Sequence, residues 1–335
     1  MDFRAKPIVR GNADTSRQRS RRLRRRLGRT LLAALVTAAV VVPLSGAARQ
    51  EIPAPPPAVL APLTASTLDA AYAANRADAA EAARMAADHG DHTRAAADRA
   101  MAAPSRRFLS FDGRGSGRAA EVFGDLAHAD RVAVLVPGSD TTLETYGRFR
   151  ALSALALYDR LGPRGAVIAW LGYETPGTVS TTVITPDRAE QAAPLLRAFL
   201  HRLRGVAGRS AHLSLLCHSY GTVVCGRAAP GLDVSDIVVF GSPGTGASSA
   251  AALRTPARVW AARGSADWIA YVPHTSVGLF GTTVGLGPDP VSPSFGARVF
   301  RTGTAGHSDY LAPGSVSLAN LTRIVLGDTS EVTRA

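Results

Sequence analysis

The feature that most constrains the fold is a short segment centred on Ser219. Residues 211–227 read AHLSLLCHSYGTVVCGR, an apolar strand followed by a tight turn and the start of a helix. In such a small-x-Ser-x-Gly turn the apex residue has a strained backbone, and the residues two before and two after must be small. Cys217 and Gly221 meet that requirement. The pattern predicts that Ser219 stands clear of a sheet edge, at the N-terminus of the following helix.

Apolar strands and amphipathic helices alternate from residue 106 to the end of the chain. Near-continuous apolar strands separated by such helices are typical of a mostly parallel sheet covered on both faces. We expect an α/β fold of about eight strands that begins with an antiparallel hairpin, and Ser219 directly after the fifth strand. The predicted elements are strands 107–112, 118–123, 131–136, 166–171, 213–216, 237–240, 257–262 and 297–301, with helices over 142–161, 187–205 and 315–326.

The N-terminal part divides into an export signal or anchor over residues 1–48, a proline-rich linker over 49–63 and an alanine-rich helical segment over 64–103. We predict that residues 104–335 form a single catalytic domain. Residues 1–50 hold 12 of the 38 basic and 2 of the 26 acidic residues, which is +10 of the net charge of +12. The remainder is nearly neutral, so the charge does not indicate a nucleic-acid partner.

The leader resembles an export signal. An arginine-rich tract over 21–29 precedes an apolar run over 31–42 and small residues over 45–48. A spanning helix needs about 20 apolar residues, and this run is shorter. We therefore expect a protein that is secreted or held in the cell envelope. Cleavage near residue 48, retention as an N-terminal membrane anchor and a cytosolic basic tail are the three alternatives, in that order of preference.

Two smaller features have plain structural interpretations. The cluster Asp88-His89-Gly90-Asp91-His92 resembles a metal site, but no further ligands follow at coordinating spacing, so a polar turn between two helices explains it better. The chain has two cysteines, Cys217 and Cys225. We interpret them as small buried apolar residues rather than as a disulfide.

Several motifs in order resemble the α/β-hydrolases, and in particular a branch from high-GC bacteria catalogued as a hydrolase domain of unknown function. The resemblance covers residues 107–327. It rests on the following stretches: LVPG at 135–138, WLGY at 170–173, HSYG at 218–221, GSPG at 241–244, GPDP at 287–290, FGAR at 295–298 and HSDY at 307–310.

Catalysis by a serine requires a base that removes its proton and an acid that orients the base. In this fold the chain order is Ser, acid, His. Of His274 and His307, the histidines that follow Ser219, His307 lies in a loop just past the last strand, and we predict it as the base. Asp267 follows the seventh strand by a short turn, and we predict it as the acid.

Two rival acids are less favoured, because Asp289 lies between prolines in a turn and Asp309 is too near His307 in sequence.

The backbone N–H groups of Ser139 and Tyr220 are the predicted oxyanion donors. Gly138, Tyr173 and His218 are expected to contact the substrate. The loops over 172–186 and 265–296 are expected to wall the substrate site. Their composition favours an uncharged or amphiphilic, lipid-like ester.

The predicted activity is that of a serine esterase that needs no cofactor or metal, in a monomer whose membrane association would come from its N-terminus. An acyltransferase with the same triad and a non-catalytic envelope binding module remain alternatives.

Overall fold

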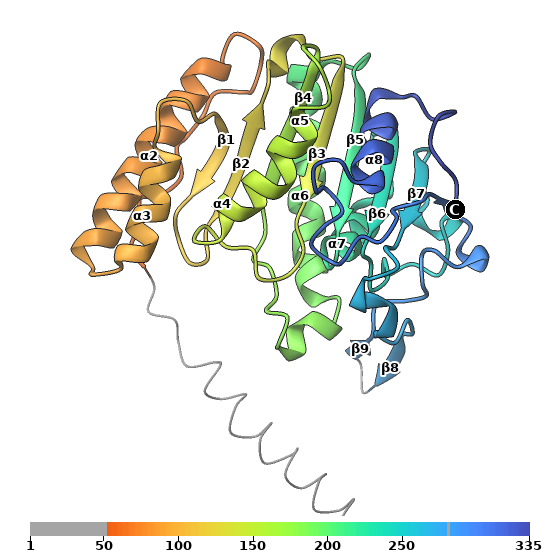
Figure 1. Cartoon of the computed structure of the whole chain (residues 1–335). Helices are drawn as coiled ribbons and strands as arrows, with labels where there is room; N and C mark the ends of the chain where they lie inside the picture. Colours follow the sequence, from red (N-terminus) through yellow and green to blue (C-terminus); the bar gives the residue numbers. More distant parts are fainter. Residues whose placement is uncertain (1–51, 280–281) are drawn as a thin grey trace, which may run out of the picture. The chain divides into compact units, whose positions relative to one another are not determined.

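An eight-stranded sheet forms the centre of the computed structural model, which describes residues 52–279 and 282–335 (Figure 1). The strand order is β1-β2-β4-β3-β5-β6-β7-β10. β1 and β2 form the expected antiparallel hairpin, β2 pairs antiparallel with β4, and all other pairs are parallel. The strands are β1 (Phe108–Asp112), β2 (Arg118–Phe123), β3 (Arg131–Val136), β4 (Gly165–Leu171), β5 (His212–His218), β6 (Asp236–Phe240), β7 (Arg258–Ala262) and β10 (Arg298–Val299).

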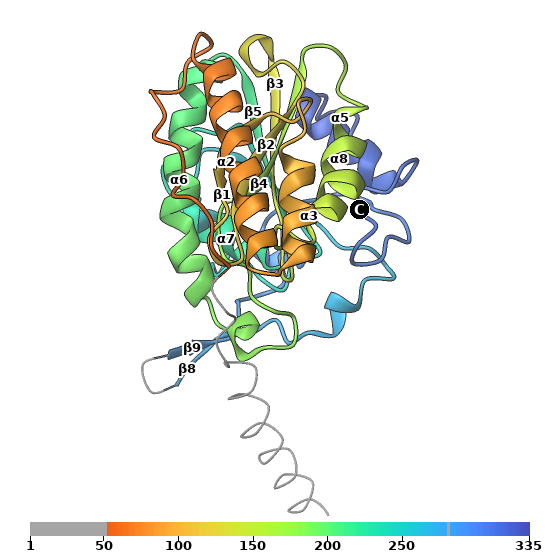
Figure 2. The same ribbon diagram turned by 90° about the vertical axis from the view of Figure 1, so that its left-hand side faces the viewer.

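Helices cover both faces of this sheet (Figure 2). Successive side chains of a strand point to opposite faces, so β3 contributes Val132, Val134 and Val136 to one core and Ala133 and Leu135 to the other. The first core contains α6 (Asp187–Ala207) and α7 (Gly221–Ala228), and the second contains α5 (Ala156–Tyr158) and α8 (Val316–Leu326). The predicted α/β fold is confirmed, including the position of Ser219 after the fifth strand.

Two N-terminal helices, α2 (Leu68–Asp88) and α3 (His92–Met101), lie where the alanine-rich segment predicted them. Figures 1 and 2 both show α2 beside β1, the edge strand of the sheet. Asn75 of α2 is buried and donates a hydrogen bond of 2.9 Å to the Phe108 carbonyl of β1. The Asp91 carboxylate caps α3 by accepting a hydrogen bond from the Arg94 N–H, so the polar cluster at 88–92 forms a helix-to-helix turn.

The predicted linker over 49–63 is described from Ile52 onward. It has no helix or strand, and it packs against the rest of the protein. The Ala58 N–H donates to the Asp78 carboxylate of α2 at 2.7 Å, and Leu63 packs against the core. The predicted leader over 1–48 lies outside the described residues. None of the helices in the described part of the chain has the length and apolarity that a bilayer span requires.

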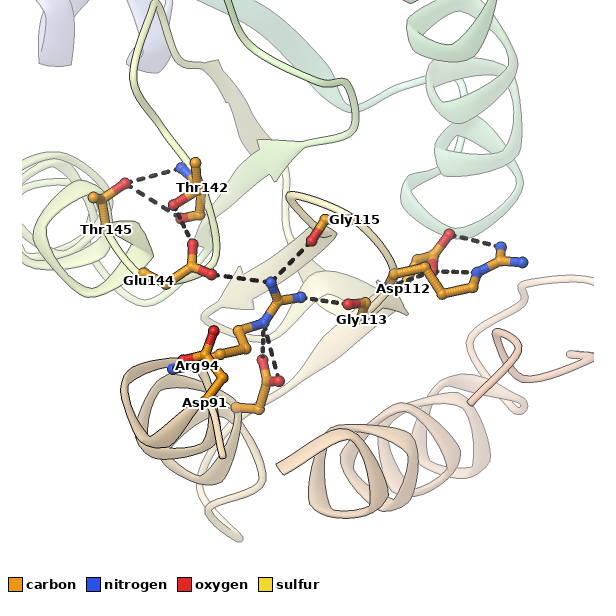
Figure 3. Close-up of polar contacts among 10 residues, drawn as sticks. Asp91, Arg94, Asp112, Gly113, Gly115, Thr142, Glu144 and Thr145 are labelled. Carbon is orange, nitrogen blue, oxygen red and sulfur yellow. Dashed lines mark hydrogen bonds and ion pairs between the residues drawn. The ribbon is translucent and has the colours of Figure 1, made fainter. Parts of the chain in front are cut away.

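Arg94 anchors α3 to the part of the chain that contains the sheet (Figure 3). Its side chain is fully buried and forms an ion pair with Asp98 at 3.0 Å and another with Glu144 at 3.1 Å. It also donates to the carbonyls of Gly113 and Gly115, in the turn between β1 and β2, at 2.5 and 3.0 Å. A buried guanidinium is stable only when such partners satisfy its N–H groups. The residue therefore holds α3 both to the hairpin and to the segment around Glu144.

Two predicted elements differ from the structure. The helix expected over 142–161 begins at Tyr146 and changes type along its length: α4 (Tyr146–Phe149) leads into a π-helical stretch (Arg150–Leu155) and then α5. The strand expected over 297–301 is shorter, because only Arg298 and Val299 pair with β7. Phe300 instead forms an isolated bridge with Arg334 near the C-terminus.

Candidate active site

The turn at Ser219 has the conformation that its sequence predicts. Ser219 lies between β5 and α7 with φ of 53°, a left-handed conformation that is uncommon for a residue with a side chain. Its side chain faces a cavity at the carboxyl edge of the sheet. A Cβ atom on Gly221 would lie 2.5 Å from the Pro137 carbonyl oxygen, so a larger residue there would force β3 and the turn apart.

The three residues predicted as a triad meet at this turn. His307 Nε2 lies 2.9 Å from Ser219 Oγ, and His307 Nδ1 lies 2.9 Å from Asp267 Oδ1. An ionised carboxylate only accepts hydrogen bonds, so Nδ1 carries the proton and Nε2 is free to accept from the serine hydroxyl. The rivals lie elsewhere: His274 contacts the Ser242 carbonyl, and Asp289 is paired with Arg263.

Asp267 is held by more donors than the histidine alone. Oδ1 also accepts from the Ile269 N–H at 2.9 Å, and Oδ2 accepts from the Tyr310 hydroxyl at 2.5 Å. Burial opposes ionisation of this carboxyl, but the hydrogen bonds from His307, Tyr310 and Ile269 outweigh it and lower its pKa. The side chain is therefore a fixed anion next to His307.

Sequence reasoning did not assign a role to Tyr310. Its hydroxyl donates to Asp267 and accepts from the Gly264 N–H at 2.8 Å, so it links the acid to the loop after β7. Burial, with the neighbouring Asp267, raises the pKa of Tyr310 well above its ordinary value. The only signal in the sequence was its place three residues after His307 in the HSDY motif.

His218 supports the backbone of His307. Its Nε2 lies 2.7 Å from the His307 carbonyl oxygen, which can only accept, so His218 is protonated at Nε2. The two imidazole rings pack with their centroids 4.8 Å apart. Burial and the charge of the neighbouring His307 lower the pKa of His218 to about 3, so it stays neutral at physiological pH. His218 also lines the cavity, as its predicted substrate contact requires.

The loop after β3 lies directly against the serine. A Cβ atom on Gly138 would be 2.5 Å from Ser219 Cβ, so only glycine permits this approach. Within the described part of the chain, the backbone N–H groups of Ser139 and Tyr220 donate no hydrogen bond, and both residues line the cavity. These are the two donors predicted for an oxyanion.

Tyr173 does not lie on the cavity wall, which corrects its predicted contact with substrate. It is 2 % exposed, stacks on Trp170 and donates its hydroxyl to the Pro137 carbonyl at 2.7 Å. Its large ring fills the core behind the loop, so it holds the backbone next to Gly138. The loop is fixed further by Asp140, whose N–H donates to the Pro176 carbonyl at 3.0 Å.

The cavity beside Ser219 has a volume of about 960 Å³. The two predicted loops both contribute to its wall, for example through Val183 and Ile184 from one and Trp268 and Leu286 from the other. A third side was not predicted. It comes from α4, its N-cap and the π-helical stretch, with the lining residues Thr145, Arg148, Phe149, Leu152 and Ser153.

Cys217 and Cys225 form a disulfide, which corrects the interpretation of two free buried cysteines. The pair joins the end of β5 to α7 across the turn that carries Ser219. Their Cα atoms are 6.5 Å apart, within the range that a disulfide spans, because the sharp turn folds the helix back toward the strand. Both cysteines are fully buried.

Comparisons with known proteins agree with this fold. A family model described as alpha/beta hydrolase matches residues 112–277. An uncharacterized protein of Mycobacterium tuberculosis is 31% identical over 245 residues, covering 64% of this chain and 37% of the relative. One of Mycobacterium bovis is 31% identical over 176 residues, covering 48% of this chain and 66% of the relative. The chain thus spans between about a third and two thirds of the length of these relatives.

Solved structures were also found to be similar. The crystal structure of an a/b serine hydrolase without lid from Xanthomonas campestris has a TM-score of 0.42 and 17% identity, covering 68% of this chain and 95% of that one. The crystal structure of esterase PE8 has a TM-score of 0.39 and 16% identity, covering 61% and 95%. The strand order and the family match point the same way, and the chain therefore belongs to the α/β-hydrolases.

Proposed function

We propose that this α/β-hydrolase is a serine esterase that cleaves carboxylic esters through an acyl-enzyme. The observation that carries the proposal is the continuous chain of hydrogen bonds from Ser219 through His307 to Asp267, with the serine facing a large cavity. A binding module has no need of a serine hydroxyl aligned with a histidine and a buried carboxylate. This alignment is what converts a weak nucleophile into an effective one.

In the proposed reaction, Ser219 Oγ attacks the ester carbonyl carbon while His307 Nε2 takes the hydroxyl proton. The imidazolium is stabilised by the Asp267 anion, and the developing oxyanion accepts from the N–H groups of Ser139 and Tyr220. Collapse of the tetrahedral intermediate breaks the bond to the alcohol oxygen, which receives the proton from His307. Water then attacks the acyl-enzyme by the same steps and releases the acid.

The proposal also includes export of the protein. Its support is the disulfide between Cys217 and Cys225, because such bonds persist in oxidising compartments and are rare in the cytosol. The arginine-rich and apolar leader over 1–48 fits the same location. Intact-mass measurement on protein from the culture medium and from membranes tests this. A mature form that begins near residue 49 supports cleavage, whereas a full-length membrane-bound form supports an anchor and a cytosolic full-length form opposes export.

Labelling with a fluorophosphonate, which reacts with activated serines, tests the nucleophile. The wild type should be labelled and Ser219→Ala should not. Ser308→Ala is the matched control, because Ser308 also lines the cavity but makes no contact in the hydrogen-bond chain, and it should be labelled like the wild type. Labelling that persists in Ser219→Ala refutes the assignment. Product analysis in water with and without added alcohol then separates hydrolysis from acyl transfer.

A further inference from the structure

The cavity is larger and less polar than a short-chain ester requires. Its volume of about 960 Å³ is near the upper end of the range for sites that bury a drug-sized ligand. Apart from the histidines, its charged lining residues are Asp140 and Arg148. The Asp140 carboxylate is engaged by the Thr178 N–H at 3.1 Å. Buried apolar side chains form its inner surface, namely Leu135, Val136, Phe240, Ile269, Leu286 and Leu311.

Large apolar side chains are exposed mainly around this cavity. In the described part of the chain eight such residues are exposed, and five of them belong to the three segments that form the cavity wall: Leu152, Val179, Ile184, Trp268 and Tyr271. Exposed apolar area is unfavourable in water, so its concentration at one opening indicates a function. Leu152, Ile184 and Trp268 are 49%, 48% and 47% exposed and also line the cavity, and we call these three residues the apolar rim.

Each side of the opening contributes one member of the apolar rim. Leu152 comes from the π-helical stretch, a helix type that is rare and often found at functional sites. Ile184 comes from the loop before α6, and Trp268 directly follows Asp267. The Trp268 ring packs on His307 with centroids 4.5 Å apart, so the rim begins at the catalytic histidine.

From these observations we propose that the substrate is an ester with a long alkyl chain. The chain would lie along the buried apolar surface from Ser219 and leave the cavity across the apolar rim, where Leu152 and Ile184 set the preference for chain length. This inference rests on the proposed esterase function and adds the substrate class. A short acyl group would leave most of the apolar surface in water, whereas a long one covers both the inner surface and the rim.

The test is the rate of hydrolysis of p-nitrophenyl esters from acetate to decanoate, all kept below their micelle concentration. Each methylene that becomes buried should raise kcat/KM by about two- to fourfold. The ratio of decanoate to acetate activity should fall at least about fivefold in Leu152→Ser and in Ile184→Ser, because a hydroxyl replaces part of the apolar contact.

Two matched controls separate the rim from exposed apolar surface in general. Leu195 is 41% exposed and Val316 is 48% exposed, and neither lines the cavity. Leu195→Ser and Val316→Ser should keep the wild-type ratio. A ratio that falls equally in the controls, or a wild-type rate that declines beyond acetate, overturns the inference. Fluorophosphonate labelling without hydrolysis of any long-chain ester also overturns it but leaves the serine assignment standing. Absence of labelling instead refutes the proposed function.

Discussion

The disulfide between Cys217 and Cys225 should stabilise the folded protein. The double variant Cys217→Ala/Cys225→Ala, which lacks this bond, should therefore have a lower free energy of unfolding than the wild type. The cysteines are separated by 8 positions. In the chain-entropy treatment, closing a loop of that size in the unfolded chain contributes about 2.5 kcal/mol to the free energy of unfolding. For a domain of this size, each kcal/mol corresponds to about 2–4 °C in Tm, so the double variant should unfold about 5–10 °C below the wild type.

Thermal unfolding followed by circular dichroism measures this difference. Because both cysteines are fully buried, reductant should not reach the disulfide while the wild type is folded. Wild-type protein that has met reductant only in the native state should therefore keep its Tm. Protein that is unfolded, reduced and refolded in reductant should match the double variant. Ser219 lies between the two cysteines, so the rate of fluorophosphonate labelling is a second readout of how well the turn is held. A double variant within 2 °C of the wild type, with unchanged labelling, would refute the reasoning.

Three other predictions concern single side chains. Asp267→Asn should lower kcat by about 10²- to 10⁴-fold with KM and Tm nearly unchanged, because the histidine loses its orienting anion. Asp289→Asn should instead lower Tm and leave kcat unchanged. Steady-state kinetics and thermal unfolding of both variants decide which aspartate is the acid. His218→Leu should lower kcat by about tenfold or more through misplacement of His307, and His218→Gln, which keeps an N–H donor, should recover part of it; equal kinetics in the two variants would contradict this role. Burial of Asp236 opposes its ionisation, but hydrogen bonds from neighbouring side chains lower its pKa, so its stabilisation is present above about pH 4 and is lost as the pH falls through the lowered pKa. Asp236→Asn should therefore unfold more easily at pH 7 in urea and lose less stability than the wild type between pH 4 and pH 2.

Local sequence patterns were sufficient to predict the sheet and the three residues that meet at Ser219. The turn at Ser219 can be recognised from the residues next to it, because the flanking positions must be small. Gly221 is one of them, since it passes so close to the Pro137 carbonyl oxygen that a Cβ atom has no room. His307 and Asp267 follow strands whose ends lie at the same edge of the sheet, so their order in the chain predicts their meeting in space.

Other features depend on contacts between distant residues and could not be read from local patterns. Tyr310 reaches Asp267 across 43 positions, and nothing in its own neighbourhood specifies that partner. Tyr173 resembled a substrate contact because it follows a strand end, but its ring turns into the core beside Trp170. The disulfide was not predicted, because Cys217 lies at the end of a strand and Cys225 lies more than one helical turn into the next helix, which suggests that they are far apart. The sharp turn at Ser219 places the helix back beside the strand, and the two cysteines meet there.

The position of α2 beside β1 has a consequence for how this protein can be shortened. An uncovered edge strand presents unpaired backbone groups to any other chain with an exposed edge. Asn75 of α2 occupies the Phe108 carbonyl of that edge, and Arg94 of α3 satisfies two further carbonyls in the adjoining turn. A truncated protein that begins at Arg106 would keep Ser219, Asp267 and His307, but its edge strand would be uncovered and Glu144 would lose its ion pair with Arg94. We therefore expect the helices over 68–101 to keep this edge from pairing with another chain, and a shortened form of the protein should retain them.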